Sequence, residues 1–255
     1  MRVFTHRAAL LIAVTTLLAI PAMPQQAAEA DLPTMLRVTR FEVKPGKATV
    51  FQDLVRNRIL PAYQKNGHAM STWRGTQLAN RFTFAFVSTP ENFAELDRGA
   101  GWADAMGEGA AADTWARFRD SITSMTGVMD RYRHDLSYRP DNDPLTMVII
   151  VDLIAAPGAN AEIEQFFKRD VVAAHKKVGS RGFTVRQNIF GGQGDRQYTV
   201  AVPIENFAEL DKGSALVQAL GVDGWAALGK RIAPLFTSVE YSVVQRVEGL
   251  GTDLE

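Results

Sequence analysis

The chain has no cysteine among its 255 residues, which excludes disulfide bonds, thiolate nucleophiles and metal sites built from cysteine. It also lacks an excess of charge of either sign, because 28 basic side chains balance 28 acidic ones. A balanced chain has no broad positive field to attract nucleic acids, so we expect no nucleic-acid partner. Only four histidines are present, and none has the spacing of a metal-binding motif, so we expect no metal site.

Long apolar runs are absent after the first thirty residues. The run Ala8 to Ile20 has thirteen residues, too few to cross a bilayer about 30 Å thick. Basic Arg2 and Arg7 precede this run and Ala28-Glu29-Ala30 follows it, which is the order of a secretory signal peptide. We therefore expect cleavage after Ala30, a periplasmic or secreted protein and no stable membrane span. An uncleaved N-terminal anchor is the alternative.

The chain contains an internal repeat. The seven residues Glu91 to Asp97 recur unchanged as Glu205 to Asp211. A second pair of matching segments lies upstream, where Pro45-Gly46 aligns with Pro157-Gly158. This self-similarity predicts four parts: a signal peptide (1–30), a first repeat (31–139), a linker between two prolines (140–144) and a second repeat (145–255).

Each repeat has the pattern of strand, helix, strand, strand, helix, strand. That order is typical of the ferredoxin-like fold, in which both helices cover one face of a four-stranded antiparallel sheet. We expect a short helix from Pro90, longer helices from about Asp113 and Val222, and a kink at Pro61 in the first helix. The strand 145–154 is apolar on both faces, so the open face of one sheet must be covered by the other. The fold class is therefore α+β, with two tandem βαββαβ repeats packed face to face.

With these features the chain resembles the dimeric α+β barrel superfamily in its fused tandem form, and its NIPSNAP-like branch in particular. The resemblance is carried by the Pro-Gly turn after the first strand, the helix that ends near Tyr63 or His175, and the repeated Glu-Asn-Phe-Ala-Glu-Leu-Asp segment. It implies an intramolecular dimeric α+β barrel with ligands between the helices and the sheet of one repeat. The superfamily includes cofactor-free monooxygenases, haem enzymes and ligand-binding regulators, so it assigns no catalytic residue here. Oligomer formation stays open.

The equivalent residues Tyr63 and His175 are the first candidate site. Both lie at the edge of the apolar stripe of their helix, where a polar tip can reach the gap between helix and sheet. His175 has the chemistry of an axial haem ligand or a general base. The alternative is a partly exposed residue at a helix end with no chemical role.

The aligned arginines Arg74 and Arg186 are the second candidate site. If Trp73 and Val185 face the helices, both guanidinium groups face the opposing sheet and can hold a carboxylate. The alternative is a structural ion pair, for which the acidic partners are Asp130, Asp135 and Glu240.

Differences between the repeats predict where a pocket lies. Trp73 of the first repeat would fill the space that Val185 leaves open in the second, so we expect the larger cavity around His175, Phe183 and Val185. The alternative is that the phenylalanines of the second repeat close this space: Phe166, Phe167, Phe183 and Phe190.

We interpret the chain as an exported protein that binds a small hydrophobic or carboxylate ligand or has a structural role, without catalysis. The second hypothesis is a haem-dependent or cofactor-free oxidoreductase of the monooxygenase kind, with His175 as ligand or base and Arg186 near the substrate.

Overall fold

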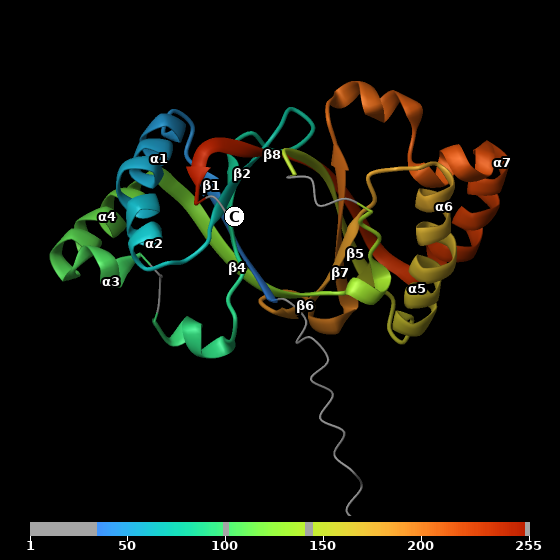
Figure 1. The fold of residues 1–255 in the computed structure, drawn as a ribbon, viewed down its shortest axis with the longest axis horizontal. Coiled ribbons are helices and arrows are strands. Elements are labelled where there is room, and N and C mark those ends of the chain that lie inside the picture. Colours follow the sequence, from blue (N-terminus) through green and yellow to red (C-terminus); the bar gives the residue numbers. More distant parts are fainter. Residues whose placement is uncertain (1–34, 99–101, 141–144, 253–255) are drawn as a thin grey trace, which may run out of the picture. The chain divides into compact units, whose positions relative to one another are not determined.

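The computed structural model describes residues 35–98, 102–140 and 145–252, which belong to one compact unit (Figure 1). The predicted signal peptide and its cleavage site lie outside the described residues, as does most of the predicted linker. The boundaries of the four parts stay a prediction.

Both repeats have the expected order of elements. The first contains β1 (Met35–Val43), α1 (Ala48–Leu54), α2 (Leu60–Lys65), β2 (Ser71–Gly75), β3 (Thr83–Ser88), α3 (Ala103–Met106), α4 (Glu108–Ser121) and β4 (Ile122–Tyr132). The second contains β5 (Met147–Ala155), α5 (Asn160–Phe166), α6 (Val172–Lys177), β6 (Thr184–Phe190), β7 (Gln197–Ile204), α7 (Ala215–Ile232) and β8 (Phe236–Gly251). Short 3-10 helices are Phe93–Arg98, His134–Leu136, Gly194–Arg196, Phe207–Lys212 and Ala233–Leu235.

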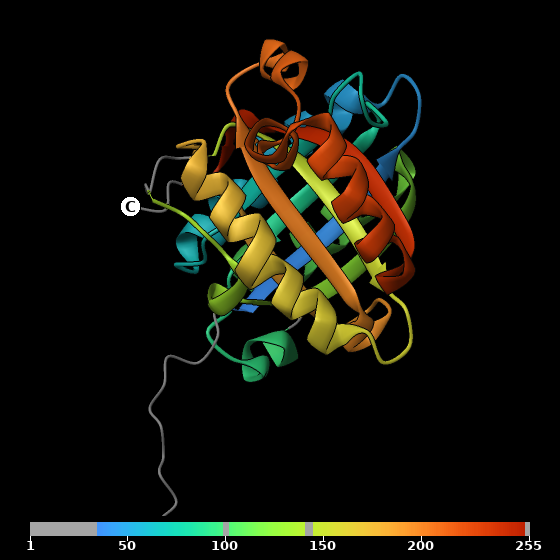
Figure 2. The same cartoon turned by 90° about the vertical axis from the view of Figure 1, so that its right-hand side faces the viewer.

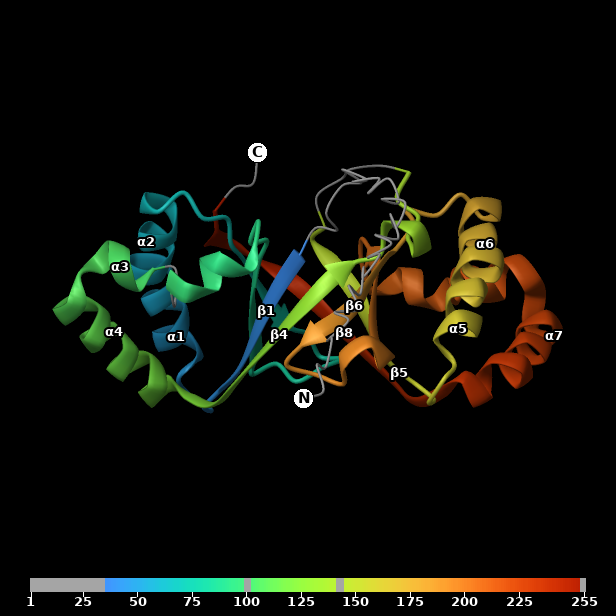
Figure 3. The ribbon, with the colours of Figure 1, turned by 90° about the horizontal axis from the view of Figure 1, so that it is seen from below.

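The eight strands form one closed antiparallel barrel in the order β1-β3-β2-β8-β5-β7-β6-β4. Within it each repeat keeps the ferredoxin-like order, β4-β1-β3-β2 and β8-β5-β7-β6. The predicted α+β class and the intramolecular barrel are therefore confirmed. The two sheets do more than face each other, because β2 pairs with β8 and β4 pairs with β6 at the two seams. Helices α1–α4 flank one side of the barrel and α5–α7 flank the other (Figures 1 and 3).

Side chains alternate along each strand between the helix-covered face of the sheet and the barrel interior. In β1, Phe41 and Val43 pack into the core below the helices, whereas Leu36 and Val38 face the barrel interior. Each repeat thus has its own core between sheet and helices. In the second repeat the helices cross the outer face of the strands (Figure 2).

Two helix predictions need correction. A π-helical segment precedes α2 at Val55–Ile59, and the second repeat has the same feature at Phe167–Val171 without any proline. Pro61 is therefore not required for it, and lies inside the continuous helical run 48–65, directly after the π-helical segment. The short helix expected from Pro90 is a 3-10 helix that begins at Phe93.

A glycine with positive φ precedes the long second helix of the first repeat and interrupts that of the second. Gly107 has φ 79° and α4 follows it directly, five residues earlier than predicted. Gly221, with φ 72°, breaks α7 at the matching place, so the predicted start at Val222 is correct for the second part of that helix.

Candidate functional site

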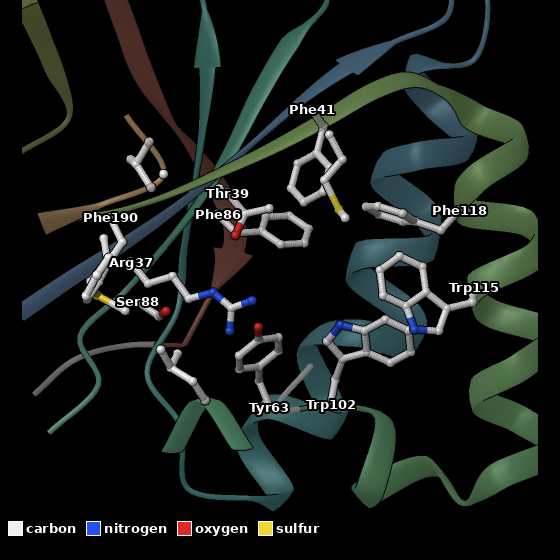
Figure 4. Close-up of a pocket in the computed structure, with 16 residues that line it drawn as sticks. Arg37, Thr39, Phe41, Tyr63, Phe86, Ser88, Trp102, Trp115, Phe118 and Phe190 are labelled. Atoms are coloured by element: carbon white, nitrogen blue, oxygen red, sulfur yellow. The ribbon is translucent and has the colours of Figure 1, made fainter. Parts of the chain in front are cut away.

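A cavity of about 500 Å³ lies between the sheet and the helices of the first repeat (Figure 4). We call it the first-repeat cavity. Its walls come from β1, β3, β4, α2 and α4, with the residue before α3 and the end of β6. The residues that line it and carry the following argument are Arg37, Tyr63, Trp102, Trp115, Phe118 and Phe190.

Aromatic rings make up the deep end of this cavity. Trp115 and Phe118 are three residues apart on α4, so both side chains project from the same face of the helix toward the sheet. Trp102 packs against Trp115 with 5.1 Å between ring centroids, and Phe118 packs edge-on against Phe41 at 5.0 Å. These contacts hold flat apolar surfaces around the space, which suits a ring-shaped ligand.

Arg37 and Tyr63 form the polar end. Alternation along β1 places Arg37 on the same face as Phe41, so its guanidinium enters the cavity beside the Tyr63 hydroxyl (Figure 4). Within the described part of the chain, the guanidinium of Arg37 has no ion pair or hydrogen bond. Burial raises the pKa of Tyr63 above its usual 10.0, and the positive charge of Arg37 partly offsets this. The phenol therefore keeps its proton at neutral pH, and both groups can donate hydrogen bonds to an acceptor placed in the cavity.

The mouth of the cavity is shared between the repeats. Phe190, at the end of β6 in the second repeat, lines the cavity and packs on Phe93 with 5.7 Å between centroids. A small recess of about 50 Å³ adjoins the polar end, and Arg37 and Tyr63 line it together with His68 and Glu95.

The second repeat has a cavity of about 570 Å³ in the matching place, lined by His175. The offset that aligns Tyr63 with His175 also aligns Arg37 with Ile149, so this cavity has an aliphatic residue where the first has a cation. The Nδ1 atom of His175 lies 2.7 Å from the Ser180 hydroxyl, and its ring packs on Phe183 at 4.6 Å. Burial lowers the pKa of His175 to about 4, so the imidazole is neutral at physiological pH.

The structure does not bring the predicted site residues together. Phe183 and Val185 are fully buried in the second core, and neither lines the cavity that contains His175. Phe166 and Phe167 pack with them, as the alternative expected, whereas Phe190 lies at the first-repeat cavity with 62% of its surface exposed. Ligand binding by these residues, and haem binding by His175, stay predictions.

The premise about Trp73 is wrong. Trp73 pairs in register with Ala85, and both line the barrel interior, so Trp73 leaves the helix–sheet space of its own repeat open. Val185 does face the helices and Arg186 the barrel interior. The Thr-x-Arg alignment of β2 with β6 is therefore out of step by one residue, and one residue is enough to exchange the faces of a strand. Arg74 pairs with Phe84 of the helix-facing core, although both residues also border the barrel cavity that Arg186 lines.

Sequence reasoning missed Arg37, Trp102, Trp115 and Phe118. The signal for Arg37 was available, since alternation along 37–43 puts a cation on the apolar face of the strand where the second repeat has Ile149. The tryptophans gave no such signal, because only the packing of α3 and α4 brings them to one wall.

Comparisons with known proteins agree with this architecture at the level of the fold. No family model matches the chain, and no curated protein matches its sequence. Among solved structures, an anthrone oxidase-like protein has a TM-score of 0.59 at 12% identity, covering 85% of this chain and 92% of that one. A candidate monooxygenase from Fusobacterium nucleatum has a TM-score of 0.55 at 10% identity, covering 86% and 94%. The comparisons therefore show a dimeric α+β barrel fold.

A NIPSNAP domain protein from Burkholderia xenovorans is also similar, at 9% identity and a TM-score of 0.32 over 37% of this chain and 90% of that one. Assignment to the NIPSNAP-like branch stays a prediction. Among the described residues, no helix has the length and apolar character to cross a bilayer. No three His, Asp or Glu side chains of this part gather as a metal site would require.

Proposed function

We propose that this dimeric α+β barrel protein binds a small aromatic molecule with an acidic oxygen in the first-repeat cavity. The observation that carries the proposal is Arg37, a cation without an ion pair among the described residues, beside the protonated Tyr63 at one end of an aromatic space. The aromatic walls would hold the rings, and the two donors would hold the oxygen. A cavity of about 500 Å³ is in the range of small-molecule sites.

Binding without catalysis is favoured by what lines this cavity. Its described lining residues include no Asp, Glu or His, so the enclosed space offers no side chain suited to proton abstraction near neutral pH.

A cofactor-free oxidation is the second candidate, because the adjoining recess brings His68 and Glu95 next to Arg37 and Tyr63. His68 would remove a proton from the ligand, Arg37 would stabilise the resulting oxyanion, and molecular oxygen would be the oxidant. The names of the structural neighbours, an anthrone oxidase-like protein and a candidate monooxygenase, point in the same direction.

Anthrone is a suitable probe, because its enol tautomer carries an acidic oxygen on three fused rings. We expect it to quench the fluorescence of Trp102 and Trp115, and Arg37→Met to weaken its binding by about tenfold. Dihydroanthracene has the rings without the oxygen, so Arg37→Met should leave its binding unchanged.

A blocking variant tests the location. Gly127 lines the cavity, and a Cβ added there would meet no atom within 4 Å, so we expect the longer side chain of Gly127→Leu to extend into the cavity and occupy it. Anthrone binding that persists in Gly127→Leu would contradict the site. Oxygen consumption with anthrone, lost in His68→Asn, would favour the enzyme over the binding protein.

Export is part of the proposal and is supported by the signal-like order of the first thirty residues. Cell fractionation should find a shortened protein outside the cytoplasm. Full-length protein in the cytoplasm would contradict export and leave the binding site untouched.

A further inference from the structure

The barrel interior holds a separate cavity of about 470 Å³ that the proposed function does not use. Inward-facing residues of both repeats line it. Much of its wall is apolar, formed by Leu36, Val38, Val148, Ile150, Ala201 and Val244. Polar side chains also point inward from these strands. Because a buried polar group is costly without a hydrogen bond, each one needs a partner inside the barrel.

Three acidic side chains of the interior already have donors, whereas Glu240, which also lines the cavity, has none among the described residues. Asp152 accepts hydrogen bonds from the Thr199 hydroxyl at 2.6 Å and from Arg40 at 3.3 Å. Asp130 accepts one from the Asn188 amide at 3.1 Å. Glu42 accepts from Asn80 and Thr83 at 2.8 and 2.6 Å.

Arg186 differs from these groups. The residue is only 8% exposed and lines the cavity, yet its Nε has no hydrogen-bond partner. Its closest acidic atom is the Oδ2 of Asp130, 3.8 Å from Nη1, which is an ion pair but too long for a hydrogen bond. Within the described residues this buried guanidinium therefore makes no hydrogen bond, although it carries five N–H donors. Buried donors without acceptors are costly and uncommon in native proteins.

We propose that the barrel interior is a second binding site, for a small carboxylate with an apolar body, held by Arg186. The planar guanidinium matches a carboxylate in a two-point geometry that an ammonium group cannot reproduce. The apolar walls receive the rest of the ligand. Asp130 keeps the empty site from burying an isolated positive charge, and its own negative charge weakens carboxylate binding. The site stands on different residues from the first-repeat cavity and does not depend on the proposed function.

Benzoate, with benzamide as its neutral analogue, tests the site in the full protein by NMR. We expect benzoate to shift the Nε–H signal of Arg186 and the backbone amides of Thr184 and Ala201, which are register partners next to it. Benzamide has no charge to pair with the guanidinium and should shift them little. No shift with millimolar benzoate would overturn the proposal.

Variants separate binding from a merely structural ion pair. Arg186→Met should raise the Kd for benzoate by about tenfold or more, while Arg131→Met, an exposed arginine of the adjoining strand, should not change it. Because Arg186→Met leaves Asp130 buried and unpaired, the double variant with Asp130→Asn provides a neutral version of the same change.

Asp130→Asn alone gives the sharpest result. If Arg186 is a binding group, removing the negative charge at 3.8 Å should tighten benzoate binding several-fold. If Arg186 only neutralises Asp130, the substitution should leave benzoate binding unchanged, and that result would refute the proposal. If benzoate causes no shift of Thr184 and Ala201 in the wild-type protein while anthrone still binds, the barrel site is refuted and the first-repeat site is not affected.

Discussion

The buried imidazole of His175 should make the stability of the protein depend on pH between about 4 and 6.5. Burial holds its pKa at about 4 in the folded protein, against 6.5 for an ordinary histidine. In this window the unfolded chain binds a proton that the folded chain does not, so the free energy of unfolding falls as the pH is lowered. The contribution of the neutral His175 side chain to the free energy of unfolding is fully present above pH 6.5 and is lost as the pH falls to about 4. His175→Asn removes the titration and keeps an acceptor for the Ser180 hydroxyl.

The size of the effect follows from the two pKa values. A difference from 6.5 to about 4 corresponds to at most about 3.4 kcal/mol, and about 2.4 kcal/mol of it falls between pH 7 and pH 4.5. The side chain borders a cavity, where solvent screens its charge, so we expect about 2 kcal/mol.

Urea unfolding at pH 7 and pH 4.5 measures this directly. The wild-type protein should lose about 2 kcal/mol more than His175→Asn between the two values. His134→Asn, which changes an exposed histidine, serves as the control and should follow the wild type. Equal losses in wild type and His175→Asn would refute the reasoning, because the imidazole would then titrate alike in both states.

Two further predictions concern packing. Phe118→Ala should lower the free energy of unfolding by about 3 to 4 kcal/mol, measured by urea unfolding, because the ring is 1% exposed and packs on Phe41. A loss below about 1 kcal/mol would mean that the helices collapse onto the first-repeat cavity. Gly182→Ala should cost about 2 kcal/mol or more, since φ is +86° and the new Cβ would collide with the carbonyl of Tyr138. Gly127→Ala, in a strand with open space beside it, should change stability by less than about 0.5 kcal/mol in the same assay.

Local patterns in the chain were enough to predict the repeat, the order of elements and the fold class. The identical segments Glu91 to Asp97 and Glu205 to Asp211 show the duplication directly. Along 145–154 both sets of alternating side chains are apolar, which predicts a strand covered on both faces. The same reasoning placed Arg74 and Arg186 toward the opposing sheet on the condition that Trp73 and Val185 face the helices, and the condition holds for Val185 and fails for Trp73.

Contacts between distant elements decided the sites. The sequence determined the duplication and the ferredoxin-like order, because each depends on periodicity within a few tens of residues. Only the tertiary structure decided that β2 and β6 differ by one step in register, which sends Trp73 into the barrel and leaves the first-repeat cavity open. It also decided that the guanidinium groups of Arg37 and Arg186 lack hydrogen-bond partners within the described chain. Whether a charged group is paired depends on atoms that the fold brings from elsewhere in the chain, which no local pattern contains.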